Sequence, residues 1–81
     1  MNRIISFMRL CLQKKEVPLS WGISNIRTSK NEVAFKVYAS KYQGGIKISE
    51  NEENLILRLR DRIIPFNSPT ELFYWLDNFI E

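Results

Sequence analysis

The sequence predicts an α+β fold: an N-terminal helix, a four-stranded antiparallel meander and a C-terminal helix, with both helices packed on one face of the sheet. Three observations predict it. Apolar residues recur at helical spacing near both ends, they alternate with polar residues in between, and short polar or glycine-containing segments separate the alternating stretches. The chain has 81 residues, so we expect a single α+β domain over 1–81. Antiparallel sheets commonly bury one face, and two amphipathic helices can cover it.

The first helix is expected over residues 3–16. Its apolar side chains fall in one arc of the helical wheel: Ile4, Ile5, Phe7, Met8, Cys11 and Leu12. Asn2 is a plausible N-cap, and Pro18 stops the helix because the residue before a proline disfavours helical geometry. Cys11 lies in the apolar arc, so we interpret it as a small buried hydrophobe.

The alternating segments predict four strands. The first covers 19–28, with a bulge at Ser24 and Asn25 that explains a slip in its alternation. The second covers 32–42, and a hairpin at Gly44-Gly45 leads to a third strand containing Ile46 and Ile48. We expect Ala39 to pair with Ile48 in this hairpin, since that pairing keeps both apolar rows on one face.

The fourth strand is expected over 55–62, and Pro65 is expected to end regular pairing. A second helix follows, with Ser68 as N-cap, Pro69 in the first helical position and Glu71 in the third. Alternation and helical arcs together predict the most buried side chains: Phe35, Val37, Leu57, Leu59, Leu72, Leu76 and Phe79.

Composition excludes several classes of function. The chain has no His, one Cys and three Gly. It therefore lacks an imidazole base, an internal disulfide, a Cys-based zinc site and the common phosphate-binding loops. The cluster Glu50, Glu52 and Glu53 does not have the spacing of a calcium loop and is expected to be a solvated turn. We predict no enzymatic activity, no catalytic residue, no metal and no cofactor.

The N-terminal segment resembles a signal peptide only superficially. Arg9 interrupts its apolar stretch and no small-residue cleavage site follows. No apolar run approaches the ~20 residues that cross a bilayer. A single unpaired cysteine is typical of a reducing compartment. The prediction is a cytoplasmic protein that does not associate with membranes.

The outward face of the predicted sheet is the main candidate site. Lysine and arginine neutralise phosphates, and tyrosine can stack on unpaired bases. The candidate nucleic-acid-binding residues are Lys36, Tyr38, Tyr42, Lys47, Arg58, Arg60 and Arg62. The alternative is a solvated face, in which cations on strands discourage edge-to-edge aggregation. Arg3, Arg9 and Lys14 on the first helix are a second cationic group, but the same helix is needed to cover the sheet.

The net charge of +3 arises from 12 basic and 9 acidic residues and is weakly basic. Our first functional hypothesis is a small non-catalytic binding or protein-interaction module, with a protein partner or self-association. The alternative is a nucleic-acid-binding protein that uses the basic, tyrosine-containing outer sheet face. The two differ in their response to salt, because phosphate binding weakens steeply with salt and an apolar interface does not.

Overall fold

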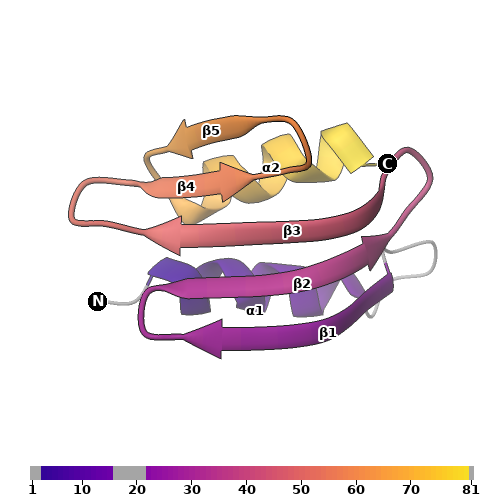
Figure 1. Cartoon of the computed structure of the whole chain (residues 1–81), viewed down its shortest axis with the longest axis horizontal. Helices are drawn as coiled ribbons and strands as arrows, with labels where there is room; N and C mark the ends of the chain where they lie inside the picture. The colour runs from indigo at the N-terminus through magenta and orange to yellow at the C-terminus, as the bar shows by residue number, and fades with distance from the viewer. Residues whose placement is uncertain (1–2, 16–21, 81) are drawn as a thin grey trace.

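The computed structural model of the chain describes residues 3–15 and 22–80 (Figure 1). The elements in chain order are α1 (Arg3–Lys15), β1 (Gly22–Ser29), β2 (Glu32–Tyr38), β3 (Gln43–Glu50), β4 (Leu55–Arg58), β5 (Ile63–Phe66) and α2 (Pro69–Ile80). The expected N-cap Asn2, the helix stop at Pro18 and the start of the first strand at Leu19 lie outside the described residues. The predicted α+β class is confirmed, with five strands in the sheet where we expected four.

The sheet is an antiparallel meander in the order β1-β2-β3-β4-β5, and both helices lie on the same face of it (Figure 1). The helices run side by side, and Phe7 of α1 lies at the centre of the core. Its ring centroid is 6.4 Å from that of Phe35 on β2 and 6.5 Å from that of Phe73 on α2. One cluster of aromatic and aliphatic side chains thus joins the two helices to the sheet.

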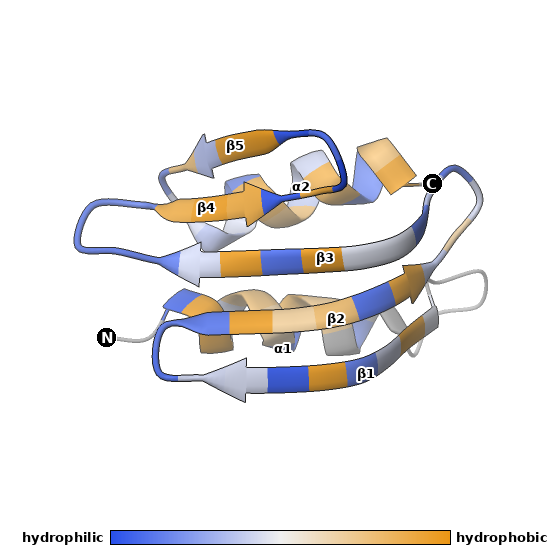
Figure 2. Ribbon diagram, viewed as in Figure 1, coloured by the Kyte–Doolittle hydropathy of each residue, from blue (hydrophilic) through white to orange (hydrophobic). Residues whose placement is uncertain are grey.

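Every second side chain in the central parts of β2 and β3 is buried in this core. Figure 2 shows the matching alternation of hydrophobic and hydrophilic residues along β3. Of the seven side chains expected to be most buried, six are buried and Phe79 is only partly buried. The face of the sheet away from the helices carries the other side chains, and we call it the outer face. The predicted bulge is confirmed: the β1–β2 register shifts between Ser24 and Arg27, and Asn25 has φ of 54°.

The predicted hairpin between β2 and β3 is wrong in its position. The turn is formed by Ala39 to Tyr42, where the Ala39 amide donates to the Tyr42 carbonyl oxygen at 3.1 Å. Gly44 and Gly45 lie inside β3, opposite Val37 and Lys36. This register sets Phe35 opposite Ile46 and Val33 opposite Ile48, which pairs larger apolar side chains than the expected register does.

Ile63–Phe66 form a fifth strand, contrary to the expectation that Pro65 ends pairing. Pro65 lies opposite Ile56, and β5 is the last strand of the sheet. A strand at the edge pairs on one side only, so a residue without an amide N–H is tolerated there. The predicted fourth strand is correspondingly shorter, because β4 ends at Arg58 and the chain turns over 59–62, with the Leu59 amide bonded to the Arg62 carbonyl oxygen.

Both ends of α2 are capped. The Glu71 amide donates to Oγ of Ser68 at 3.2 Å, which confirms the predicted N-cap. At the other end, the Lys41 amide donates to the carbonyl oxygen of Ile80 at 2.7 Å. The loop between β2 and β3 therefore satisfies one of the carbonyl groups that a helix leaves unpaired at its C-terminus.

Candidate nucleic-acid interface

The outer face carries a cationic row that runs across four strands. Arg27 on β1 lies opposite Ala34 on β2, Ala34 lies opposite Lys47 on β3, and Lys47 lies opposite Arg58 on β4. Residues directly opposite one another in an antiparallel sheet share a face. Three of the four side chains in the row are therefore positively charged and point away from the helices.

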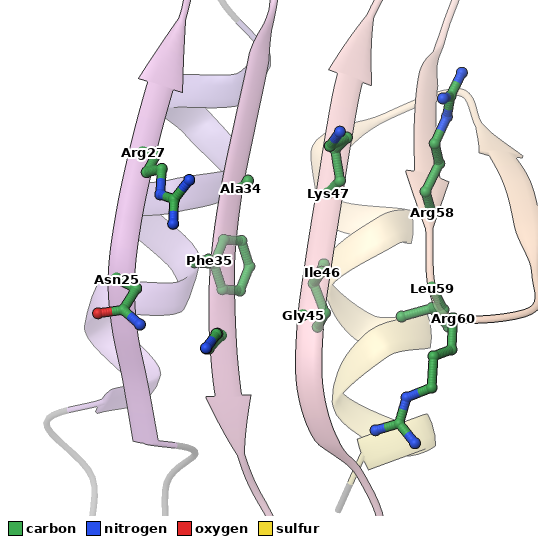
Figure 3. Close-up of a pocket in the computed structure, with 11 residues that line it drawn as sticks. Asn25, Arg27, Ala34, Phe35, Gly45, Ile46, Lys47, Arg58, Leu59 and Arg60 are labelled. Atoms are coloured by element: carbon green, nitrogen blue, oxygen red, sulfur yellow. The ribbon is translucent and has the colours of Figure 1, made fainter.

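The next row is built from Lys36 on β2 and Gly45 on β3. Together the two rows border an open hollow of about 460 Å³ (Figure 3). Ala34 and Gly45 contribute only a methyl group and a hydrogen atom to its lining, which also includes the apolar residues Phe35, Ile46 and Leu59. A Cβ built on Gly45 would have nothing within 4 Å.

Five cationic side chains line this hollow, and no acidic residue of the described chain does so. The five are Arg27, Lys36, Lys47, Arg58 and Arg60. The carboxylate of Glu32 lies at one margin, where its Oε1 is 4.0 Å from Nζ of Lys47 and its Oε2 accepts a bond from Ser49. Both members of the Lys47–Glu32 pair are well exposed, so the pair is weak and leaves Lys47 accessible to an anion.

Arg60 occupies the turn after β4, and its side chain reaches back to the beginning of β3 (Figure 3). Its guanidinium donates to the carbonyl oxygen of Gln43 and lies 5.3 Å from the centroid of the Tyr42 ring. Gly44 makes this approach possible, because a Cβ at that position would lie 2.6 Å from a guanidinium nitrogen of Arg60. Arg60 therefore forms the rim of the hollow next to the β2–β3 turn.

Two of the expected site residues, Tyr42 and Arg62, do not line the hollow. The Tyr42 ring packs 5.8 Å from Phe79 of α2, and its hydroxyl donates to the Gly45 carbonyl oxygen at 2.9 Å. Arg62 lies over the Phe79 ring at 5.2 Å. Both residues lie in turns rather than in strands, so the alternation that predicted an outward direction does not apply to them.

Tyr38 lies on the outer face beyond the hollow, two residues from Lys36 on β2. Its side chain is 71% exposed. Its partner on β1 is Gly22, which has no side chain to cover the tyrosine ring, and its partner on β3 is Gln43. The ring is therefore accessible on the same face as the cations.

Arg27 and Asn25 are not among the site residues predicted from the sequence, although both line the hollow from β1. The sequence feature that could have identified them is the bulge at Ser24 and Asn25. A bulge changes the phase of the alternation, so a residue counted from the start of the strand appears on the wrong face. When the alternation is counted from the bulge onward, Arg27 is assigned to the outer face, where it lies opposite Ala34.

Three further observations concern metal ligands, the cysteine and the helices. Residues 3–15 and 22–80 contain no group of three or more His, Cys, Asp or Glu side chains arranged to hold a metal ion. Burial, assisted by the carboxylate of Asp77, raises the pKa of the Cys11 thiol well above its ordinary range, which disfavours the reactive thiolate. None of the described helices is both long and apolar enough to span a membrane.

The chain matches no protein-family model, no curated protein and no solved structure with which it was compared. The case for an interface on the outer face therefore comes from the residues themselves.

Proposed function

We propose that this protein is a non-catalytic binding module whose outer sheet face binds nucleic acid through the phosphate backbone. The observation that carries the proposal is the set of five cationic side chains around one hollow, with no carboxylate among the described residues that line it. Lysine and arginine side chains that neutralise phosphates release condensed counterions, and this release supplies most of the affinity of backbone binding.

The solvated-face alternative explains only part of this arrangement. Cations protect a sheet from aggregation where they lie on edge strands. Arg27 is on the edge strand β1, but Lys36 and Lys47 are on the central strands β2 and β3. Clustering like charges on central strands costs electrostatic free energy in the absence of a ligand, and an anion bound in the hollow offsets that cost.

A protein-interaction or self-association function has weaker support. Among the residues that the structure describes, the large hydrophobic side chains that are exposed lie on five different elements: Ile5, Ile26, Tyr38, Ile63 and Tyr74. Of these, only Ile26 and Tyr38 lie on paired strands, whereas an apolar docking site needs a contiguous patch. The two sheet edges are also unsuited to strand addition, because a bulge interrupts β1 and β5 is short and contains Pro65.

The proposal includes a cytoplasmic location, where single-stranded and double-stranded nucleic acids are both accessible. Cys11 supports the cytoplasmic location, because its side chain is a buried free thiol. Free thiols are typical of a reducing compartment.

Titrating a fluorescein-labelled dT20 oligonucleotide with the protein at several salt concentrations tests the proposal by fluorescence anisotropy. We expect saturable binding that weakens steeply with salt, and Arg58→Ala and Lys47→Ala should each lower the slope of log K against log salt by ~0.7. Arg9→Ala is the matched control, because Arg9 is an exposed cation on α1, on the opposite side of the molecule. Absence of saturable binding at low salt, or an equal effect of Arg9→Ala, would overturn the proposal.

The two exposed tyrosines provide a second matched pair. Tyr38 is 71% exposed on the outer face, and Tyr74 is 61% exposed on α2. Tyr38→Ala should weaken binding of dT20 by about 1–3 kcal/mol through lost stacking and should leave duplex binding nearly unchanged. Tyr74→Ala should change neither. If both substitutions weaken dT20 binding equally, the ligand does not lie on the outer face.

A further inference from the structure

We infer that the hollow takes one unpaired base of a nucleic acid strand and thereby makes the outer face prefer single strands to duplexes. This inference rests on the proposed function, because it assumes that the phosphate backbone already lies on the outer face. It adds the identity of the group that enters the hollow.

The uncharged part of the lining of the hollow is suited to a flat ring. Ala34 contributes a methyl group and Gly45 contributes bare backbone, with open space where its Cβ would be. The volume of about 460 Å³ lies within the range of small-molecule sites, roughly 300–1,000 Å³. A phosphate needs hydrogen-bond donors at its contact surface, and the methyl group of Ala34 supplies none. The face of a base needs only such an uncharged surface.

The sides of the hollow provide groups that recognise bases. Arg27 and Arg58 approach it from β1 and β4, and planar guanidinium groups stack on bases. Asn25, at the bulge, lines the hollow from β1, as Arg27 does (Figure 3). Its amide carries both donors and an acceptor, which is the combination that hydrogen-bonds to the edge of a base.

The remaining cations are placed for the phosphates on either side of such a base. Lys36, Lys47 and Arg60 line the hollow from β2, from β3 and from the turn after β4. A single strand can turn a base inward while its phosphates stay on these side chains. A duplex keeps its bases stacked in its interior, so it would reach the same cations but would leave the hollow empty.

Filling the hollow without changing its charge tests the inference. Gly45→Val places a β-branched side chain in open space on a strand, where such residues are favoured. Ser29→Val is the control, because Ser29 pairs with Glu32 on the outer face but does not line the hollow. The probes are dT12, an abasic strand with the same number of phosphates and a 12-base-pair duplex.

Because a base is also expected to stack on Tyr38, these comparisons are made in a Tyr38→Ala background. The Tyr38→Ala protein should bind dT12 about five- to tenfold more tightly than the abasic strand, the effect of one stacked base. Gly45→Val should abolish that preference and should retain binding of the abasic strand and the duplex. Ser29→Val should retain the preference. Ala34→Val fills the hollow from β2 and should reproduce the result. This second variant keeps the test valid if a thermal melt shows that Gly45→Val is not folded.

Failure of the base-binding inference and failure of the proposed function would give different results. Equal binding of dT12 and the abasic strand by the Tyr38→Ala protein, or a preference that persists when Gly45→Val or Ala34→Val is added to it, would overturn the base-binding inference and leave backbone binding intact. Failure of the wild-type protein to bind any of the three probes would overturn both proposals.

Discussion

Arg3, the first described residue of α1, forms an ion pair with Glu50, the last residue of β3. Nε of Arg3 lies 2.9 Å from Oε2 of Glu50, and the two side chains are only 17% and 15% exposed. The other guanidinium nitrogens donate to the carbonyl oxygens of Glu53 at 3.1 Å and Asn51 at 2.5 Å. The first turn of the helix is thus attached to the β3–β4 turn, which the sequence analysis interpreted as merely solvated.

Removal of this attachment should destabilise the protein. We expect Arg3→Ala to lower the free energy of unfolding by about 1–3 kcal/mol, because it leaves the partly buried Glu50 carboxylate without its partner. Arg9→Ala, an exposed cation on the same helix, should change it by less than ~0.5 kcal/mol. Urea denaturation of the three proteins measures both effects. Equal midpoints for Arg3→Ala and Arg9→Ala would mean that the ion pair contributes nothing in solution.

The N-cap of α2 gives a local prediction. Ser68→Ala removes the hydroxyl that accepts from the Glu71 amide and should lower the free energy of unfolding by about 0.5–2 kcal/mol. Thr70→Ala, an exposed change within the first turn, should have little effect. Denaturant melts followed by circular dichroism make the comparison. An unchanged midpoint for Ser68→Ala would show that the helix begins at another residue.

The two adjacent glycines of β3 should respond in opposite directions. Gly44 has φ of 151°, a backbone conformation that L-residues rarely adopt, so Gly44→Ala should cost about 1–3 kcal/mol. It should also displace the guanidinium of Arg60 from the Gln43 carbonyl oxygen. Gly45→Ala meets open space and should be neutral or stabilising by up to ~1 kcal/mol. Thermal melts would contradict the structure if Gly45→Ala proved the more damaging change.

Cys11 should make stability fall at alkaline pH. Burial raises the pKa of its thiol in the folded protein above the value in the unfolded chain, so the folded state holds this proton more tightly. The contribution of Cys11 to the free energy of unfolding is fully present below the ordinary thiol pKa of about 8.5. Above that pH it declines by up to ~1.4 kcal/mol per pH unit.

Comparison with Cys11→Ala isolates this contribution from that of other groups that titrate at high pH. The variant should be less stable at pH 7, because it leaves a small cavity, but its stability should fall less steeply between pH 9 and pH 10.5. Parallel pH profiles for the two proteins would show that Cys11 is not held protonated by the fold.

The sequence predicted those features whose causes are local. Ser68, Pro69 and Glu71 mark the start of α2 because capping depends on neighbouring residues only. The bulge near Asn25 is visible as a break in alternation within one strand. Arg27 is harder to assign from the sequence, because the bulge before it reverses which residues of β1 face outward.

Alternation determined which face each central side chain takes, but it did not determine the register. The expected pairing of Ala39 with Ile48 and the observed pairing of Val33 with Ile48 differ by six residues along β2. An even shift leaves every side chain on its original face, so the sequence pattern satisfies both registers equally. Packing of Phe35 opposite Ile46, beneath Phe7 of α1, distinguishes them, and this contact exists only in the folded protein.

Some residues of the candidate site were likewise predictable from the sequence, and others depend on tertiary contacts. Lys36, Lys47 and Arg58 reach the outer face by strand alternation, so the sequence alone identified them. Tyr42 and Arg62 lie in turns, where contact with Phe79 decides their direction. The hollow was not predictable at all, because it requires Ala34 and Gly45 to be diagonal neighbours on adjacent strands. Local residue order determines helices, caps and faces, whereas register and turn geometry depend on contacts between residues distant in the chain.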